Sequence, residues 1–96
     1  MDRLDLYRVL KILAFSGTLA VMRAVKTLGR APAKDIVLYL ASENPLTLSQ
    51  VRRVLKKLLD LGFVQRVGTT PQDKRAEWQY NEEACAAFMR RMRDVF

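Results

Sequence analysis

The chain has 96 residues, half of them hydrophobic, and its seventeen Lys and Arg exceed its ten Asp and Glu to leave a formal net charge of +7. This size predicts one domain over residues 1–96, the hydrophobic share argues against disorder, and the basic excess favours a polyanionic partner. The longest uncharged run, residues 12–22, is roughly half of the ~20 residues that a membrane span needs, so we expect no membrane partner. Asp2, Asp5 and Lys11 fit a secretory leader poorly, and we therefore expect a cytoplasmic, nucleoid-associated protein.

The residue types that hold metals and carry catalysis are scarce in this chain. Cys85 is its one cysteine and it has no histidine, which excludes an internal disulfide and leaves no ligand set for a transition metal. There is no glycine-rich phosphate loop, and the acidic residues are scattered or stand at expected helix starts. The sequence therefore predicts no cofactor and no metal, and an enzyme is the least favoured function. Cys85 itself is expected to be a small core residue.

The first expected element is a helix over residues 1–15, whose apolar residues surround most of the helical wheel. Only Arg3, Arg8 and Lys11 mark a side that faces water. Such a helix needs burial on two sides, and in a chain this small a symmetric second copy is an economical way to cover one of them. We expect a homodimer whose interface includes four residues of this helix: Leu6, Tyr7, Leu10 and Leu13. The alternative is a central helix that is wrapped by its own chain.

A second helix is expected over residues 19–28, with Thr18 as its N-cap and Gly29 as its end. Its inward positions are Val21, Met22, Val25 and Leu28. Residues 31–33 should then form a short extended or turn segment, because Pro32 restricts the residue before it.

A third helix is expected over residues 33–42. It would bury Ile36, Val37 or Leu40 and stop at the turn residues 43–45.

The pattern of residues 47–61 is the most informative one in the chain. Thr47 and Gln50 match a capping box, which marks a helix start. Apolar residues then repeat at helical spacing and predict a buried face made of Val51, Val54, Leu55, Leu58 and Leu59. The other face carries Gln50, Arg53, Lys56 and Lys57, with Arg52 near its edge. A helix that is held by one face and presents cations on the other suits a DNA major groove, although such cations often serve only for solvation.

A β-hairpin is expected directly after this helix. Gly62 closes the helix, residues 63–67 are β-branched and aromatic, and residues 68–73 form a turn-rich loop. A second strand over residues 76–80 alternates apolar and polar side chains, which is typical of a half-buried hairpin arm. We interpret Trp78 in this strand as a core residue rather than one that stacks on a ligand.

Asn81 is the expected N-cap of a last helix over residues 82–96, whose first turn carries two glutamates that suit the helix dipole. Its apolar stripe is Cys85, Phe88, Met89, Met92 and Phe96. Three arginines near its end, Arg90, Arg91 and Arg93, are interpreted as surface charges matched to the dipole.

This order of elements resembles the winged helix-turn-helix superfamily over about residues 19–96. The segment KKLLDLGFVQRV is similar to the end of a recognition helix and the step into the wing in MarR-type regulators, and PQDKRAEWQYNEEA is similar to their wing and the helix after it. The resemblance implies an α+β, mostly α fold with a helix-turn-helix and two-stranded wing at 19–80, an extra N-terminal helix at 1–15 and a C-terminal helix at 82–96. It also implies a small prokaryotic or archaeal transcription regulator that binds double-stranded DNA.

The resemblance also assigns roles to single residues. Four residues near the start of the recognition helix would face base edges, where Gln suits adenine and Arg suits guanine: Ser49, Gln50, Arg52 and Arg53. Lys56 and Lys57 would contact phosphate. In the wing, Asp73 would orient Arg75 toward the minor groove, and Thr69 and Lys74 would lie beside the same DNA.

Three functions agree with this pattern. The first is a homodimeric, sequence-specific transcription regulator. The second is a chromatin- or replication-associated DNA binder of low specificity, and the third is a winged helix that docks onto proteins instead of DNA. The ratio of specific to random DNA affinity separates the first two, and salt dependence separates both from the third. No residue argues for a small-molecule effector, so the identity of any effector is unknown.

Overall fold

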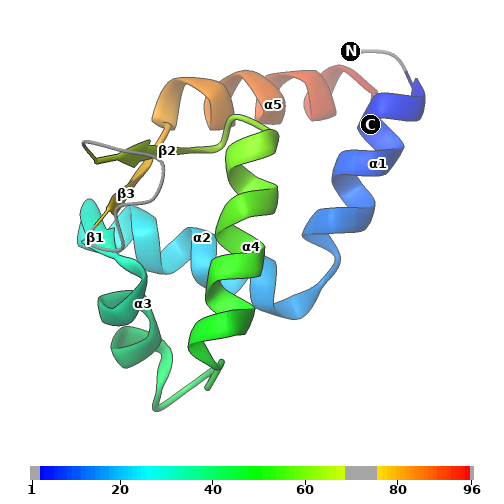
Figure 1. Ribbon diagram of the computed structural model, residues 1–96. Coiled ribbons are helices and arrows are strands. Elements are labelled where there is room, and N and C mark those ends of the chain that lie inside the picture. Colours follow the sequence, from blue (N-terminus) through cyan, green and yellow to red (C-terminus); the bar gives the residue numbers. More distant parts are fainter. Residues whose placement is uncertain (1–2, 69–75, 96) are drawn as a thin grey trace.

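The computed structural model describes residues 3–68 and 76–95 (Figure 1). Within this part the chain forms five helices and a three-stranded antiparallel sheet, which confirms the α+β, mostly α class. In chain order the elements are α1 (Arg3–Leu13), α2 (Ser16–Leu28), β1 (Arg30–Pro32), α3 (Ala33–Leu40), α4 (Leu48–Asp60), β2 (Val64–Val67), β3 (Glu77–Tyr80) and α5 (Glu82–Val95).

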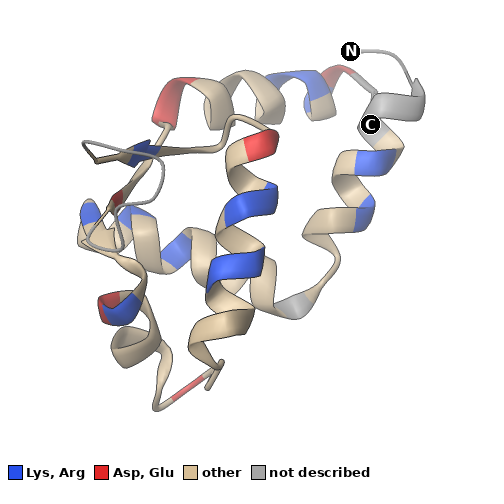
Figure 2. Ribbon diagram, viewed as in Figure 1, with Lys and Arg blue, Asp and Glu red and all other residues tan. Residues whose placement is uncertain are grey.

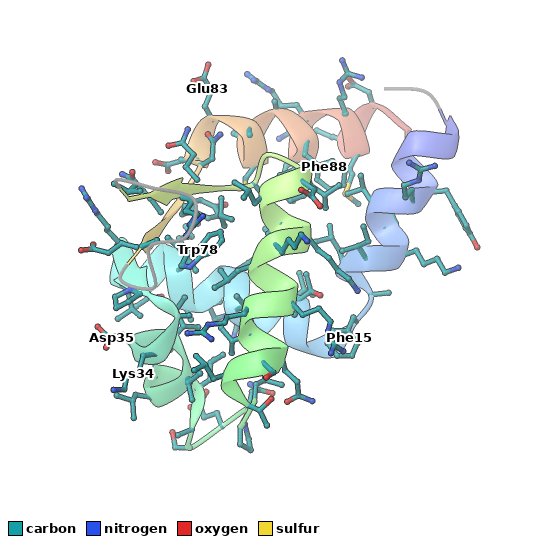
Figure 3. All side chains as sticks on the ribbon, viewed as in Figure 1. Phe15, Lys34, Asp35, Trp78, Glu83 and Phe88 are labelled. Atoms are coloured by element: carbon teal, nitrogen blue, oxygen red, sulfur yellow. The ribbon has the colours of Figure 1, made fainter. Side chains whose placement is uncertain are left out.

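The core lies where α2, α3 and α4 pack against one another, and each of these helices contacts the other two. Val25, Ile36 and Leu55, one from each helix, are fully buried at its centre. The sheet lies at one end of these helices and α5 covers the top of α4 in the view of Figure 1. Figure 3 shows that Phe88 lies on the side of α5 toward α4 whereas Glu83 points away, and Phe88 packs against Phe63 with ring centroids 5.3 Å apart.

The sheet has the strand order β1-β3-β2. The expected hairpin is β2 and β3, with Val64 opposite Tyr80 and Val67 opposite Glu77. The extended segment that was expected at residues 31–33 lies at residues 30–32, one residue earlier, and Ala33 already begins α3. The segment also pairs with β3 and so adds a strand to the two that the sequence indicated. The Arg30 Nε atom lies 3.0 Å from Glu77 Oε2, which reinforces this pairing at the point where β3 begins.

The start of α2 differs from the prediction. Thr18 was expected to be the N-cap, but α2 begins at Ser16 and Thr18 lies inside the helix with only 1% of its surface exposed. Phe15 is the N-cap and makes no side-chain capping bond, while its carbonyl accepts a hydrogen bond of 2.9 Å from the Thr18 amide. A Cβ atom at Gly17 would stand 2.9 Å from Phe15 Cε1 and 3.4 Å from Leu46 Cδ1. The glycine therefore allows close packing rather than breaking the helix.

Both ends of α4 are specified as predicted. Thr47 Oγ1 accepts a hydrogen bond from the Gln50 amide at 3.1 Å, and Gln50 Oε1 accepts one from the Thr47 amide at 2.9 Å, which completes the capping box. Gly62 closes the helix with φ 83°, and the Phe63 amide donates to the Leu58 carbonyl at 2.9 Å. The chain therefore passes from the end of α4 at Asp60 through a short turn into β2, which begins at Val64.

Asn81 caps α5 as predicted and also joins three elements, which was not predicted. Its Oδ1 accepts a hydrogen bond of 3.2 Å from the Ala84 amide. Its Nδ2 donates to the Gly62 carbonyl at 3.0 Å, and its backbone amide donates to the Phe63 carbonyl at 2.9 Å. The side chain therefore ties the end of α4 to the start of α5 beside the hairpin.

Three residues that were expected to face the core are partly exposed: Leu28 (38%), Leu59 (37%) and Met89 (59%). Leu28 is the last residue of α2, where the chain turns away at Gly29. Leu59 lies at the edge of the buried face of α4. Met89 borders a cavity between α1 and α5 instead of packed side chains. Cys85 is a buried core residue and Trp78 packs partly buried against the core, as expected.

Candidate nucleic-acid interface

The outward face of α4 is organised around a row of three residues. Ser49, Arg53 and Lys56 follow one another at spacings of four and three, so they lie along one line of the helix. All three are exposed, whereas Val51, Leu55 and Leu58 on the opposite side are 0% exposed. Figure 2 shows basic residues along the part of α4 that faces the viewer, beside the hairpin. The core therefore fixes α4 rigidly while this row stays accessible.

The other predicted contact residues of α4 flank this row. Arg52 lies on one side of it, Gln50 and Lys57 lie on the other, and all three are exposed. Asp60 continues the row at its C-terminal end, so the positive charge of α4 lies between Arg52 and Lys57. This central stretch is therefore the part of α4 that best suits a polyanion.

Gln50 has a structural role that competes with base recognition. Recognition of adenine by glutamine needs both the side-chain oxygen and the side-chain nitrogen. The Gln50 Oε1 atom already accepts the hydrogen bond from the Thr47 amide at 2.9 Å. Ser49 and Arg53 have no such role, and the structure therefore leaves them better placed than Gln50 to contact base edges.

The hairpin beside α4 is described only at its base. Thr69, Asp73, Lys74 and Arg75, the residues assigned to the wing, lie outside the described residues. The pair Val67 and Glu77 is the last one in the sheet before this segment. Strands β2 and β3 are thus the described elements on either side of it.

Two basic residues at the base of the hairpin were not among the predicted contacts. Arg30 in β1 is held by Glu77, and Arg66 in β2 lies opposite Trp78. The only sequence signal for Arg66 was its place in an expected hairpin strand. For Arg30 there was none, because its position depends on the pairing of β1 with β3.

The predicted interface residues of α1 divide into two groups. Leu10 and Leu13 are partly buried against the core of their own chain, and Val9 is 4% exposed there. Tyr7 is 68% exposed and offers most of its ring to solvent. Leu6 lies in α1, but its side chain is outside the described part. One side of α1 is thus covered by its own chain, and Tyr7 lies on the other side, where it is exposed to solvent.

Within residues 3–68 and 76–95, two kinds of feature are absent. No helix in this part is long and apolar enough to cross a membrane. No three residues of the metal-binding types His, Cys, Asp and Glu gather there.

The fold is similar to that of a known regulator. The chain superimposes on the multiple antibiotic resistance repressor MarR with a TM-score of 0.61, over 88% of this chain, at 15% sequence identity. It spans 59% of the length of that repressor. No family model and no curated protein sequence matches the chain. The packed helices α2 to α4 and the hairpin that follows thus form a fold that resembles the winged helix of the MarR repressor.

Proposed function

We propose that this protein is a transcription regulator that binds double-stranded DNA in a sequence-specific manner as a homodimer. The observation that carries the proposal is the exposed row of Ser49, Arg53 and Lys56 on a helix whose opposite face is fully buried. Because the core holds this helix in place, the helix can enter the major groove of DNA without a change in its own structure. The likeness of the fold to the MarR repressor supports the proposal. Such a protein acts where the DNA is, in the cytoplasm or on the nucleoid.

Within this proposal the residues of α4 have different tasks. Ser49, Arg52 and Arg53 contact base edges, and Gln50 does so only through its side-chain nitrogen while its oxygen caps the helix. Lys56 and Lys57 contact phosphates, which gives affinity but no sequence information.

Selection of bound sites from random duplex DNA tests the proposal. A dimeric regulator enriches an inverted repeat with half-sites about one helical turn, roughly 34 Å, apart. An unspecific pool would identify a low-specificity DNA binder, and no pool would identify a protein-docking module.

Arg53→Ala should weaken binding to the selected site by about 1–3 kcal/mol of binding free energy and should weaken binding to random DNA much less. Arg90→Ala on α5 removes the same side chain away from α4 and should change neither.

The wing supplies a second prediction. If Asp73 holds the Arg75 guanidinium by a charge-assisted hydrogen bond and aims it at the minor groove, Arg75→Ala should cost about 1–3 kcal/mol of DNA binding. Asp73→Ala should cost less, because the arginine remains, and the double variant should cost less than the sum. Thermal unfolding should stay nearly unchanged. A lower melting temperature with full DNA affinity would instead make the two residues a hairpin-stabilising pair.

The homodimer is proposed to form through α1, with Leu6, Tyr7, Leu10 and Leu13 at its interface. Because Tyr7 is 68% exposed, Tyr7→Lys should leave the monomer folded while it places a charge in the interface. We expect the unaltered protein to sediment as a dimer at micromolar concentration and the variant as a monomer. Tyr39→Lys, on α3, alters another exposed tyrosine and should leave the dimer intact. A monomer in the unaltered protein would exclude this interface.

A further inference from the structure

A polar pocket of about 270 Å³ lies between α2 and the turn that joins α3 to α4. It shares no residue with the apolar cavity that Met89 borders. Its volume is just below the range of roughly 300–1,000 Å³ that is usual for drug-sized ligands, so it suits a smaller molecule. The lining comes from three segments: Ala20 and Arg23 of α2, Tyr39 and Leu40 at the end of α3, and residues 42–44 of the turn.

The pocket has one side chain of each charge in its lining. Arg23 is an exposed residue of α2, and Glu43 is an exposed residue of the turn. Figure 2 shows basic residues on α2 and an acidic residue between α3 and α4. Within residues 3–68 and 76–95, neither side chain forms an ion pair or a hydrogen bond, with the other or with any other residue. Both charges are therefore available to a ligand.

The end of α3 adds negative charge on the Glu43 side of the pocket. The Leu40 carbonyl accepts hydrogen bonds from the amides of Glu43 at 3.3 Å and Asn44 at 2.9 Å, which keeps the turn close to the last residue of the helix. The C-terminus of a helix carries a partial negative charge that favours cations. An ammonium group is thus favoured on this side. A carboxylate is favoured at Arg23, because a planar guanidinium can bind both carboxylate oxygens.

The apolar part of the lining is small. Leu40 is buried and Ala20 is half-buried, so each offers little surface to a ligand, and Tyr39 adds part of a ring that is 44% exposed. These three side chains leave room for a short aliphatic group but not for a long chain.

We propose that this pocket binds a small zwitterion, an α-amino acid with a short aliphatic side chain. Its carboxylate lies at Arg23, its ammonium group at Glu43 and the end of α3, and its side chain against the apolar part of the lining. Because both charged residues are exposed, each contact contributes little, and the dissociation constant should be about 1 mM. A bound amino acid would join α2 to the turn that precedes Thr47, the N-cap of α4. The site does not depend on the DNA-binding proposal.

Titration of the isotope-labelled full chain with L-valine, followed by the NMR shifts of the backbone amides, tests the proposal. The shifts should be largest at residues 42–44 and near Arg23, and small throughout α5. N-acetyl-L-valine lacks the ammonium group and L-valinamide lacks the carboxylate, so each should bind about fivefold more weakly than L-valine. The absence of shifts with L-valine, shifts that centre elsewhere, or equal affinity for the three ligands would overturn the proposal.

Variants of the protein identify which charge meets which. Arg23→Gln should weaken L-valine about fivefold and leave L-valinamide unchanged, because that ligand has no carboxylate for the arginine to bind. Glu43→Gln should likewise weaken L-valine and leave N-acetyl-L-valine unchanged. Both residues are exposed, so neither change should disturb folding.

Matched controls come from α5, which contributes no residue to the pocket. Arg91→Gln and Glu83→Gln remove the same two charges at exposed positions and should change the affinity for none of the three ligands. A loss that is equal for L-valine and for the analogue without the matching charge would mean that Arg23 and Glu43 do not contact the ligand's charged groups. That result, or full L-valine affinity in both pocket variants, would contradict the proposed zwitterion site.

Discussion

Raising the salt concentration from about 50 to about 200 mM should weaken the binding of this protein to duplex DNA by about a thousandfold, if some six phosphates are contacted. The reason is counterion release: each cation that neutralises a phosphate frees an ion into solution, and this gain shrinks as salt rises. Residues 46–80 hold seven of the seventeen Lys and Arg against three acids, so the α4 and hairpin segment carries the largest local excess of positive charge.

The slope of this salt dependence identifies the residues involved. Lys56→Gln and Lys57→Gln together should reduce the slope by about one unit per lysine and weaken all DNA sequences alike. Arg90→Gln with Arg91→Gln removes the same charge from α5 and should leave the slope unchanged. Equal slopes of DNA affinity against salt concentration for the two double variants would show that only the net charge of the protein matters. DNA affinity that does not change with salt concentration would exclude contact between α4 and the phosphate backbone.

Leu55→Ala should reduce the free energy of unfolding by about 3–5 kcal/mol. Leu55 is 0% exposed at the centre of the buried face of α4, so the change removes packed atoms and leaves a cavity. Domains of this size are marginally stable, so such a loss removes a large part of the total free energy of unfolding. The exposed row on the other side of α4 should lose its fixed position at the same time.

Leu38→Ala is the matched control, because it makes the same chemical change at a residue of α3 that is 69% exposed. Its free energy of unfolding should stay within about 0.5 kcal/mol of the unaltered protein. Urea unfolding followed by circular dichroism measures both variants. Equal losses would mean that α4 is not held by the buried face that the structure shows.

Where local chemistry decides a feature, sequence and structure agree. The capping box of Thr47 and Gln50, the positive φ at Gly62 and the cap at Asn81 involve residues within four positions of the groups that they serve. The apolar spacing of α4 likewise predicted its buried face, because helical periodicity is a property of a short segment. The recognition helix and the hairpin after it could therefore be read from the residues themselves.

Other features depend on residues far apart in the chain, and there the sequence was insufficient. Thr18 was expected to cap α2, but close packing of Gly17 against Leu46 lets α2 start earlier and buries the threonine. Contacts of this kind join residues that are distant in sequence, and the periodicity of one segment cannot express them.

The sequence by itself determined the element types, the cationic face of α4 and the basic balance that favours a polyanionic partner, since these follow from side-chain type and spacing. Only the tertiary structure decided that β1 joins the hairpin and places Arg30 beside Glu77. It alone brought the Lys26 Nζ atom to 5.6 Å from the centroid of the Tyr80 ring. Strand pairing and cavity shape arise from the packing of elements that are distant in sequence, and single-sequence patterns carry no information on which of them meet.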